Sequence, residues 1–89
     1  MDRAALGALG DMIASIRLPG EAMVVLAVGT HGPSVDCPNG SMSATVRVGS
    51  DEATSGAVHL HDALFLARGK CREMAERRRR EAEQKKEAA

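Results

Sequence analysis

The sequence predicts a small α+β domain of order α-β-β-α, with an antiparallel sheet of two or three strands, two helices and a long charged C-terminal helix. Apolar residues recur at spacings of three and four near both ends of the chain, which is the pattern of an amphipathic α-helix. Between them lie a continuous Val-rich run and an alternating apolar-polar run, both typical of strands. Helices at both ends of a stretch of strands indicate helices layered on one sheet face.

The first helix is predicted over residues 2–17. Asp2 is placed to cap or charge its first turn, and Arg17 lies in the last turn, where a cation suits the helix dipole. Gly7 and Gly10 each cost up to about 1 kcal/mol relative to Ala, unless they permit close packing against another element. Pro19-Gly20 ends the helix. One apolar stripe is formed by Leu6, Leu9, Ile13 and Ile16.

Two strands follow in the middle of the chain. The continuous run over residues 23–29 predicts a buried strand, and the alternation over residues 42–48 predicts a strand with one solvent-exposed face. Asn39-Gly40 is a strong turn signal because both residues tolerate positive φ. Residues 34–37 form either a short third strand or plain loop, because Pro38 next to them restricts pairing. The polar, mixed composition of residues 49–56 predicts a loop.

The second helix is predicted to begin near His59, with Asp62 in its first turn, where a carboxylate is favourable. After Met74 the apolar stripe stops while helix-forming residues continue to the end of the chain. We therefore expect a compact domain over residues 1–75 and a charged helical extension over residues 76–89. The apolar stripe is formed by Leu60, Leu64, Ala67, Cys71 and Met74.

The composition predicts a thin core. The chain has 89 residues, of which 44% are hydrophobic, but Phe65 is the only aromatic residue. A chain of this size removes only roughly 60% of its unfolded surface from water when it folds. Because aromatic side chains bury the most area per residue, a domain almost without them favours association with a second copy or a larger partner.

Charge is segregated along the chain although the formal net charge is zero. Residues 1–62 hold three basic and seven acidic side chains, whereas residues 63–89 hold nine basic and five acidic ones. Such a chain presents an acidic body and a basic helix to different partners, or pairs with itself. The candidate partner-binding residues are Arg68, Arg72, Arg77, Arg78, Arg79 and Arg80 on the basic side and Asp36, Asp51 and Glu52 on the acidic side.

The run of arginines at residues 77–80 raises the question of nucleic-acid binding. Consecutive helical residues lie about 100° apart, so these arginines encircle the helix axis and do not form a stripe that fits a groove. Glutamates also interleave with them at i to i+4 spacing, and each such pair is worth about 0.2–0.5 kcal/mol. The pattern favours a solvated, self-supporting helix over partner docking, and partner docking over nucleic-acid binding. The three expected pairs are Glu73 with Arg77, Glu76 with Arg80 and Glu81 with Lys85.

No motif for metal binding, cofactor binding or catalysis is recognisable. The spacing of the possible zinc ligands matches no C-x-x-C or H-x₃₋₅-H pattern, and no G-x-S-x-G elbow surrounds a serine. Gly69-Lys70 lacks the remaining residues of a phosphate loop, and Gly69 marks either close approach of a partner or a tolerated helix defect. We therefore expect no metal, no cofactor and no enzymatic activity. The possible ligands are His31, Cys37, His59, His61 and Cys71.

The sequence predicts a cytoplasmic protein without a membrane segment. Asp2 and Asp11 are acidic where a secretory leader is basic and then apolar. The longest apolar run, residues 22–28, is far shorter than the roughly 20 residues that span a bilayer. We accordingly expect Cys37 and Cys71 to be reduced thiols.

These features favour a non-enzymatic binding protein that stoichiometrically modulates or inhibits a larger protein or nucleoprotein complex. In size and economy the chain is similar to small phage or mobile-element inhibitors of the anti-CRISPR kind, a resemblance of style and not of residues. Two alternatives are a nucleic-acid-binding accessory protein that uses the basic helix and a structural homodimer that pairs strand edges or terminal helices.

Overall fold

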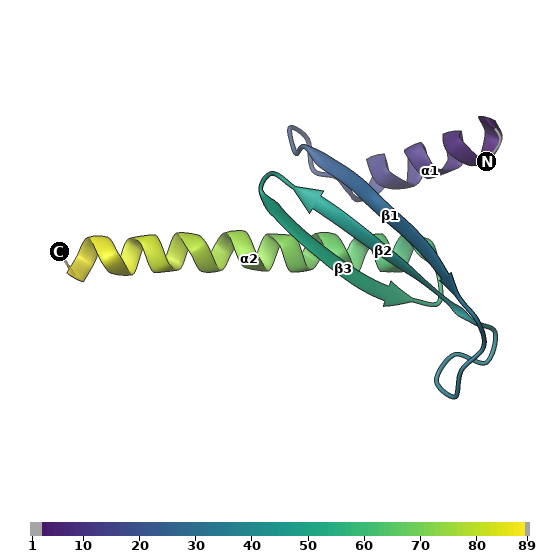
Figure 1. Ribbon diagram of the computed structural model, residues 1–89. Coiled ribbons are helices and arrows are strands. Elements are labelled where there is room, and N and C mark those ends of the chain that lie inside the picture. The colour runs from purple at the N-terminus through teal and green to yellow at the C-terminus, as the bar shows by residue number, and fades with distance from the viewer. Residues whose placement is uncertain (1–2, 89) are drawn as a thin grey trace.

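The computed structural model describes residues 3–88, which form two helices and three strands (Figure 1). The predicted small α+β fold is confirmed, with an antiparallel sheet, two helices and a long charged C-terminal helix, and its full order is α-β-β-β-α. The elements are α1 (Arg3–Ile16), β1 (Met23–His31), β2 (Ser41–Val48), β3 (Asp51–Ala57) and α2 (Leu60–Ala88).

Helix α1 forms where the helical spacing predicts it. Ile16 is buried, and Leu9 and Ile13 pack half-buried against the core. Leu6 is exposed, and Figure 1 shows the N-terminal end of α1 pointing away from the sheet. The helix stops before Pro19-Gly20 as predicted, and Gly20 adopts a φ of 81° that glycine accepts without strain. The expected capping residue Asp2 lies outside the described residues.

The three strands form an antiparallel meander in the order β1-β2-β3, with β2 in the centre. Val48 at the end of β2 pairs with Met23 of β1 on one side and with Asp51 of β3 on the other. The register of β1 shifts between Val25 and Ala27, so β1 carries a bulge there. Strands β1 and β3 are therefore the two edges of the sheet.

Of the two alternatives that the sequence left open for residues 34–37, the structure shows the loop, and the third strand lies elsewhere, at Asp51–Ala57. Residues 34–37 form a turn, in which the Ser34 N–H donates to the Cys37 carbonyl (2.9 Å) and the Cys37 N–H donates to Ser34 Oγ (3.1 Å). The side-chain hydroxyl and the backbone thus satisfy each other locally, and the segment is a plain loop.

The loop predicted over residues 49–56 is wrong for most of its length, because β3 occupies it. Gly49, at a φ of 63°, and Ser50 reverse the chain so that β3 returns along β2. Most residues of β3 are Asp, Glu, Ala or Gly, which are depleted in strands, but strand formation depends on the neighbouring strand and on burial. Here Ala53 is buried opposite Val46 while Thr54 faces solvent.

The core lies where α2 crosses β2 and β3 (Figure 1). Within α2, Leu64, Ala67 and Cys71 are buried, which confirms most of the predicted stripe. Met74 is 39% exposed, so the buried part of the stripe ends at Cys71, one turn earlier than expected. The fully buried apolar residues of the described chain are Ile16, Met23, Ala44, Val46, Ala53, Ala63, Leu64, Ala67 and Cys71.

The opposite face of the sheet is polar, as the alternation in β2 predicts. Ser43, Thr45 and Arg47 lie on it, while Ala44 and Val46 face the core. Side-chain hydrogen bonds join neighbouring strands on this face. Thr45 Oγ1 lies 2.7 Å from Thr54 Oγ1, and Ser43 Oγ lies 3.0 Å from His31 Nε2. It therefore behaves as a solvated sheet face.

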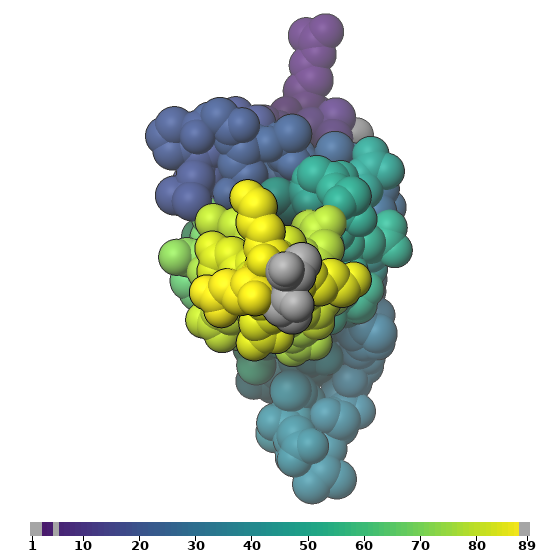
Figure 2. All heavy atoms as spheres, turned by 90° about the vertical axis from the view of Figure 1, so that its left-hand side faces the viewer, coloured from purple at the N-terminus to yellow at the C-terminus, as the bar shows by residue number. Residues whose placement is uncertain are grey.

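The molecule is flat and extended. Its principal extents are 53 × 33 × 16 Å, and its radius of gyration is 15.8 Å, compared with roughly 12 Å for a compact domain of this length. Helix α2 runs without interruption through residue 75 and projects beyond the sheet, and Figure 2 looks along this projecting end. One helix layer on one sheet layer, with a free helix end, accounts for the shape.

The loop between β1 and β2 provides a test of the fold. Gly40 has a φ of 88°, and a Cβ there would lie 2.6 Å from the His31 carbonyl oxygen, whereas a Cβ on Gly32 would meet nothing within 4 Å. We expect Gly40→Ala to lower the free energy of unfolding by more than about 1 kcal/mol. The matched Gly32→Ala change stays within about 0.5 kcal/mol. Urea unfolding followed by circular dichroism measures both, and equal effects would contradict the turn geometry.

Candidate functional site

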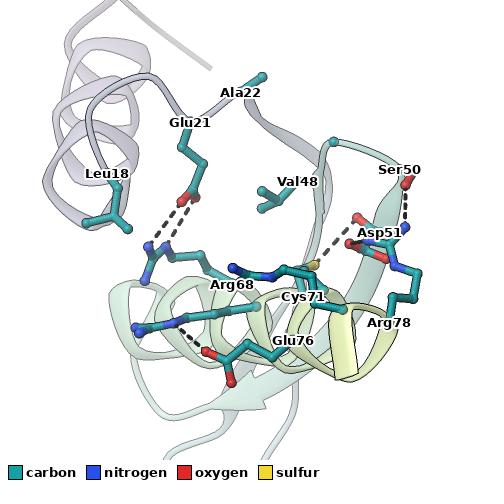
Figure 3. Close-up of a pocket in the computed structure, with 14 residues that line it drawn as sticks. Leu18, Glu21, Ala22, Val48, Ser50, Asp51, Arg68, Cys71, Glu76 and Arg78 are labelled. Atoms are coloured by element: carbon teal, nitrogen blue, oxygen red, sulfur yellow. Dashed lines mark hydrogen bonds and ion pairs between the residues drawn. The ribbon is translucent and has the colours of Figure 1, made fainter. Parts of the chain in front are cut away.

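Most of the predicted partner-binding arginines gather at one cleft of about 760 Å³ (Figure 3). Its walls are the α1–β1 connection at residues 18–22, the β2–β3 turn at residues 48–51 and the middle of α2. Ala22 and Val48 make part of the lining apolar, while the α2 side is rich in arginine and glutamate. The cleft therefore combines an apolar lining with a charged α2 wall.

Arg68 is the most buried charged side chain of the described residues and is paired within the chain. Its Nε donates to Glu21 Oε1 and its Nη2 to Glu21 Oε2, both at 3.1 Å, as the dashed lines in Figure 3 show. The two side chains are 10% and 15% exposed. A bidentate arginine-carboxylate pair is geometrically specific, so it holds the α1–β1 connection at a fixed place on α2.

Arg78 forms a second link between α2 and the sheet. Its Nη1 donates to Ser50 Oγ at 3.0 Å, and its Nη2 pairs with Asp51 Oδ2, so both contacts fall at the β2–β3 turn (Figure 3). Arg78 is predicted to bind a partner through the basic helix and Asp51 through the acidic body. In the structure these two residues bind each other.

Cys71 contributes a thiol to the cleft from the buried face of α2. Its Sγ contacts the carbonyl oxygens of Val46 (3.7 Å) and Asp51 (3.5 Å). Burial is the main cause that raises the pKa of the Cys71 thiol above 9.0, and the negative charges of Asp51 and Glu21 add to it, against a lowering by the backbone at Val48. A protonated, buried thiol is a poor nucleophile. Cys37 and Cys71 are not bonded to each other in the structure, and Cys37 lies in the β1–β2 loop, away from the cleft.

The other predicted partner-binding residues are divided between the cleft and more distant parts of the surface. Arg72 and Arg79 line the cleft, and Arg72 pairs with Glu76 at 3.4 Å. The three glutamate-cation pairs expected on α2 are not among the ion pairs of residues 3–88. A partner-binding role for the nine residues stays a prediction. Four of them lie outside the cleft: Arg77 and Arg80 on α2, Asp36 in the β1–β2 loop and Glu52 on β3.

The possible metal ligands are likewise dispersed. His31 contacts Ser43 on the open sheet face, and His61 Nε2 lies 3.4 Å from Ser15 Oγ on α1. Within residues 3–88, no three His, Cys, Asp or Glu side chains come together in a group that could hold a metal ion.

The outer face of α2 places Gly69, which the sequence marks as a site of partner approach or a tolerated defect, next to two apolar residues that the sequence analysis did not connect with it. We define the outer α2 patch as Phe65, Leu66 and Gly69. Phe65 and Leu66 are 56% and 46% exposed, and Gly69 lies one helical turn after both of them. A Cβ on Gly69 would meet nothing within 4 Å, so packing within the chain does not require glycine at this position.

A sequence signal for this patch exists in the predicted stripe of α2. Phe65 and Leu66 fall outside the 60, 64, 67, 71 series, so they point away from the sheet when that series points toward it. Asp62 precedes them by three or four residues, and Arg72 follows Gly69 by three. An apolar centre with charged flanks resembles the centre and rim of a protein interface.

Comparison of the chain with protein families, curated proteins and solved structures found no match. Of the helices described in residues 3–88, neither is long and apolar enough to cross a membrane.

The Arg68–Glu21 pair is testable by a double-mutant cycle. We expect Arg68→Met and Glu21→Met each to lower the free energy of unfolding by roughly 3 kcal/mol, because each leaves an almost buried charge without its partner. The double variant Arg68→Met/Glu21→Met removes both charges and costs clearly less than the sum of the single effects. Urea unfolding gives the three values, and additive effects would show that the pair contributes nothing specific.

Proposed function

We propose that this chain is a non-enzymatic binding protein that docks on a larger protein or nucleoprotein complex through the outer α2 patch and modulates or inhibits it stoichiometrically. The observation that carries the proposal is the exposure of Phe65, the only aromatic residue of the chain, beside Leu66 on the solvent face of a packed helix. Exposed apolar clusters with polar surroundings mark interaction sites, and aromatic residues dominate interface energetics.

Gly69 is a second argument that the outer α2 patch is the docking surface. Glycine in a helix interior costs about 1 kcal/mol relative to Ala, and no contact within the chain offsets that cost at this position. A glycine next to two apolar side chains leaves a shallow recess on the helix. The partner that fits it is an apolar side chain or helix of another protein that approaches the α2 backbone closely.

The alternative of nucleic-acid binding is less favoured by the contacts of the basic residues. Arg68, Arg72 and Arg78 each pair with a carboxylate of the same chain. Phosphate binding would compete with those pairs. The exposed arginines that remain on the projecting end of α2 fit an acidic rim of a protein partner equally well.

The specific form of the proposal is an inhibitor of the phage or mobile-element kind, since such proteins act by occupying a surface of a larger complex. We place this activity in the cytoplasm.

Affinity capture with patch variants tests the proposal. The tagged wild-type chain should recover one host protein or complex at a fixed molar ratio, and Phe65→Ser/Leu66→Ser should reduce recovery more than about tenfold because it removes the apolar centre of the interface. Val35→Ser is the matched control, since Val35 is a fully exposed apolar residue in the β1–β2 loop. Equal recovery by the patch variant and the wild-type chain, or no recovered partner at all, argues against the proposal.

Gly69→Ala separates stability from binding at the same surface. We expect it to raise the free energy of unfolding by about 0.5–1 kcal/mol through higher helix propensity, and yet to weaken capture of the partner because its methyl group fills the recess. A variant that is more stable and captures the partner as well as the wild-type chain does would exclude Gly69 from the interface.

Titration against duplex and single-stranded nucleic acid addresses the alternative. Binding that weakens steeply with salt and is unchanged by Phe65→Ser/Leu66→Ser would replace the proposed function with nucleic-acid binding.

A further inference from the structure

The two edges of the sheet differ in how they are protected. Edge strands of natural proteins are commonly blocked by charges or covered by other groups, because a free edge pairs readily with another strand. Strand β3 begins with Asp51 and Glu52, and the Lys70 side chain donates to its Thr54 carbonyl oxygen at 2.8 Å. The edge at β3 is therefore charged and partly capped.

The edge at β1 has none of this protection. Residues 23–30 of β1 contain no Asp, Glu, Lys, Arg or Pro. Within residues 3–88, the hydrogen bonds of the β1 backbone are those to β2, and no side chain donates to a β1 carbonyl. A bulge near Leu26 is the only feature of β1 that opposes strand pairing.

Strand β1 also carries exposed apolar side chains. Helix α2 covers β2 and β3 and leaves β1 outside its main contact area. Val24, Leu26 and Val28 are 41%, 44% and 40% exposed. Val24 pairs with Arg47 on the open sheet face, whereas Val28 pairs with Ala44 on the face toward α2, and Leu26 lies at the bulge between them. Helix α1, which Figure 1 shows on the β1 side of the molecule, adds an exposed Leu6.

We propose that the outer edge of β1 pairs antiparallel with β1 of a second copy of this chain, so that a two-fold dimer forms one continuous six-stranded sheet. Two-fold pairing places identical strands against each other, which requires a strand that does not repel itself. An uncharged apolar strand meets that requirement, whereas the acidic edge of β3 and the charged end of α2 would place like charges together.

The exposed surface is large enough for such an interface. The accessible surface of the chain is 6439 Å², compared with roughly 5,000 Å² for a compact monomer of this mass. The projecting end of α2 contributes to the difference. A standard interface buries roughly 800 Å² of each partner, which is less than the surface by which this chain exceeds a compact monomer.

The dimer is independent of the proposed function, because β1 and the outer α2 patch lie on different elements. The experiment is analytical ultracentrifugation of the purified full chain over a range of concentrations, with Val24→Lys/Leu26→Lys as the edge variant. We expect the wild-type chain to sediment at twice 9.4 kDa, and the edge variant to dissociate with a Kd raised by about a hundredfold or more, because like charges then face each other across the two-fold axis.

Val58→Lys is the matched control, since Val58 is equally exposed but lies between β3 and α2. It should leave the dimer intact, and Phe65→Ser/Leu66→Ser should do so as well. Two results would overturn the proposal. One is a wild-type chain that is monomeric both in a millimolar stock and after 100-fold dilution. The other is an edge variant that still forms the dimer while circular dichroism shows that both proteins are folded.

Hydrogen exchange on the wild-type chain locates the interface without any substitution. Amides of β1 should exchange more slowly at high protein concentration than at low concentration, while amides of β3 should not change. A dimer whose concentration-dependent protection falls on α2 or β3 would place the contact elsewhere and overturn the assignment to β1.

Discussion

The packing of α2 across β2 and β3 is the constraint on which the rest of the structure depends. The contact is made largely by small residues, with Ala63 and Ala67 on the helix facing Ala44 and Ala53 on the strands. Small side chains let the helix approach the sheet closely, but they bury little area each. One helix is also too narrow to cover three strands, so β1 keeps apolar side chains in solvent.

The charged residues reinforce this single contact. Arg68 ties the α1–β1 connection to α2. Arg78, about three turns further along the same helix, ties α2 to the β2–β3 turn. The sequence shows an acidic body and a basic helix, and the structure shows that part of this separation is complementarity within the chain. A core of this size is marginal, and a nearly buried bidentate pair specifies where α2 lies along the sheet.

The sequence was sufficient to predict both helices and β2 from their apolar periodicities, and β1 from its continuous apolar run. The prediction that β1 is buried was wrong, because β1 is an edge strand outside the main contact area of α2. The sequence was not sufficient to predict β3, because Asp51, Glu52, Ala53 and Gly56 belong to residue types that are depleted in strands. This segment becomes a strand because β2 lies beside it and α2 covers one face. The cleft could not be predicted, since Glu21 and Arg68 are far apart in sequence and meet only through the fold. The outer α2 patch was within reach, because Phe65 and Leu66 fall outside the apolar stripe.

The meander topology has a consequence for how the chain is synthesised. Each strand pairs with its neighbour in sequence, so the sheet assembles from short-range contacts that close quickly. The helix that covers it is translated after the sheet, and every buried residue of that helix lies in the range from Ala63 to Cys71. Until this segment leaves the ribosome, the nascent sheet exposes both its apolar face and the edge of β1. The period between completion of β3 and docking of α2 is therefore when this chain is most exposed to chaperones and to misassembly with other nascent chains.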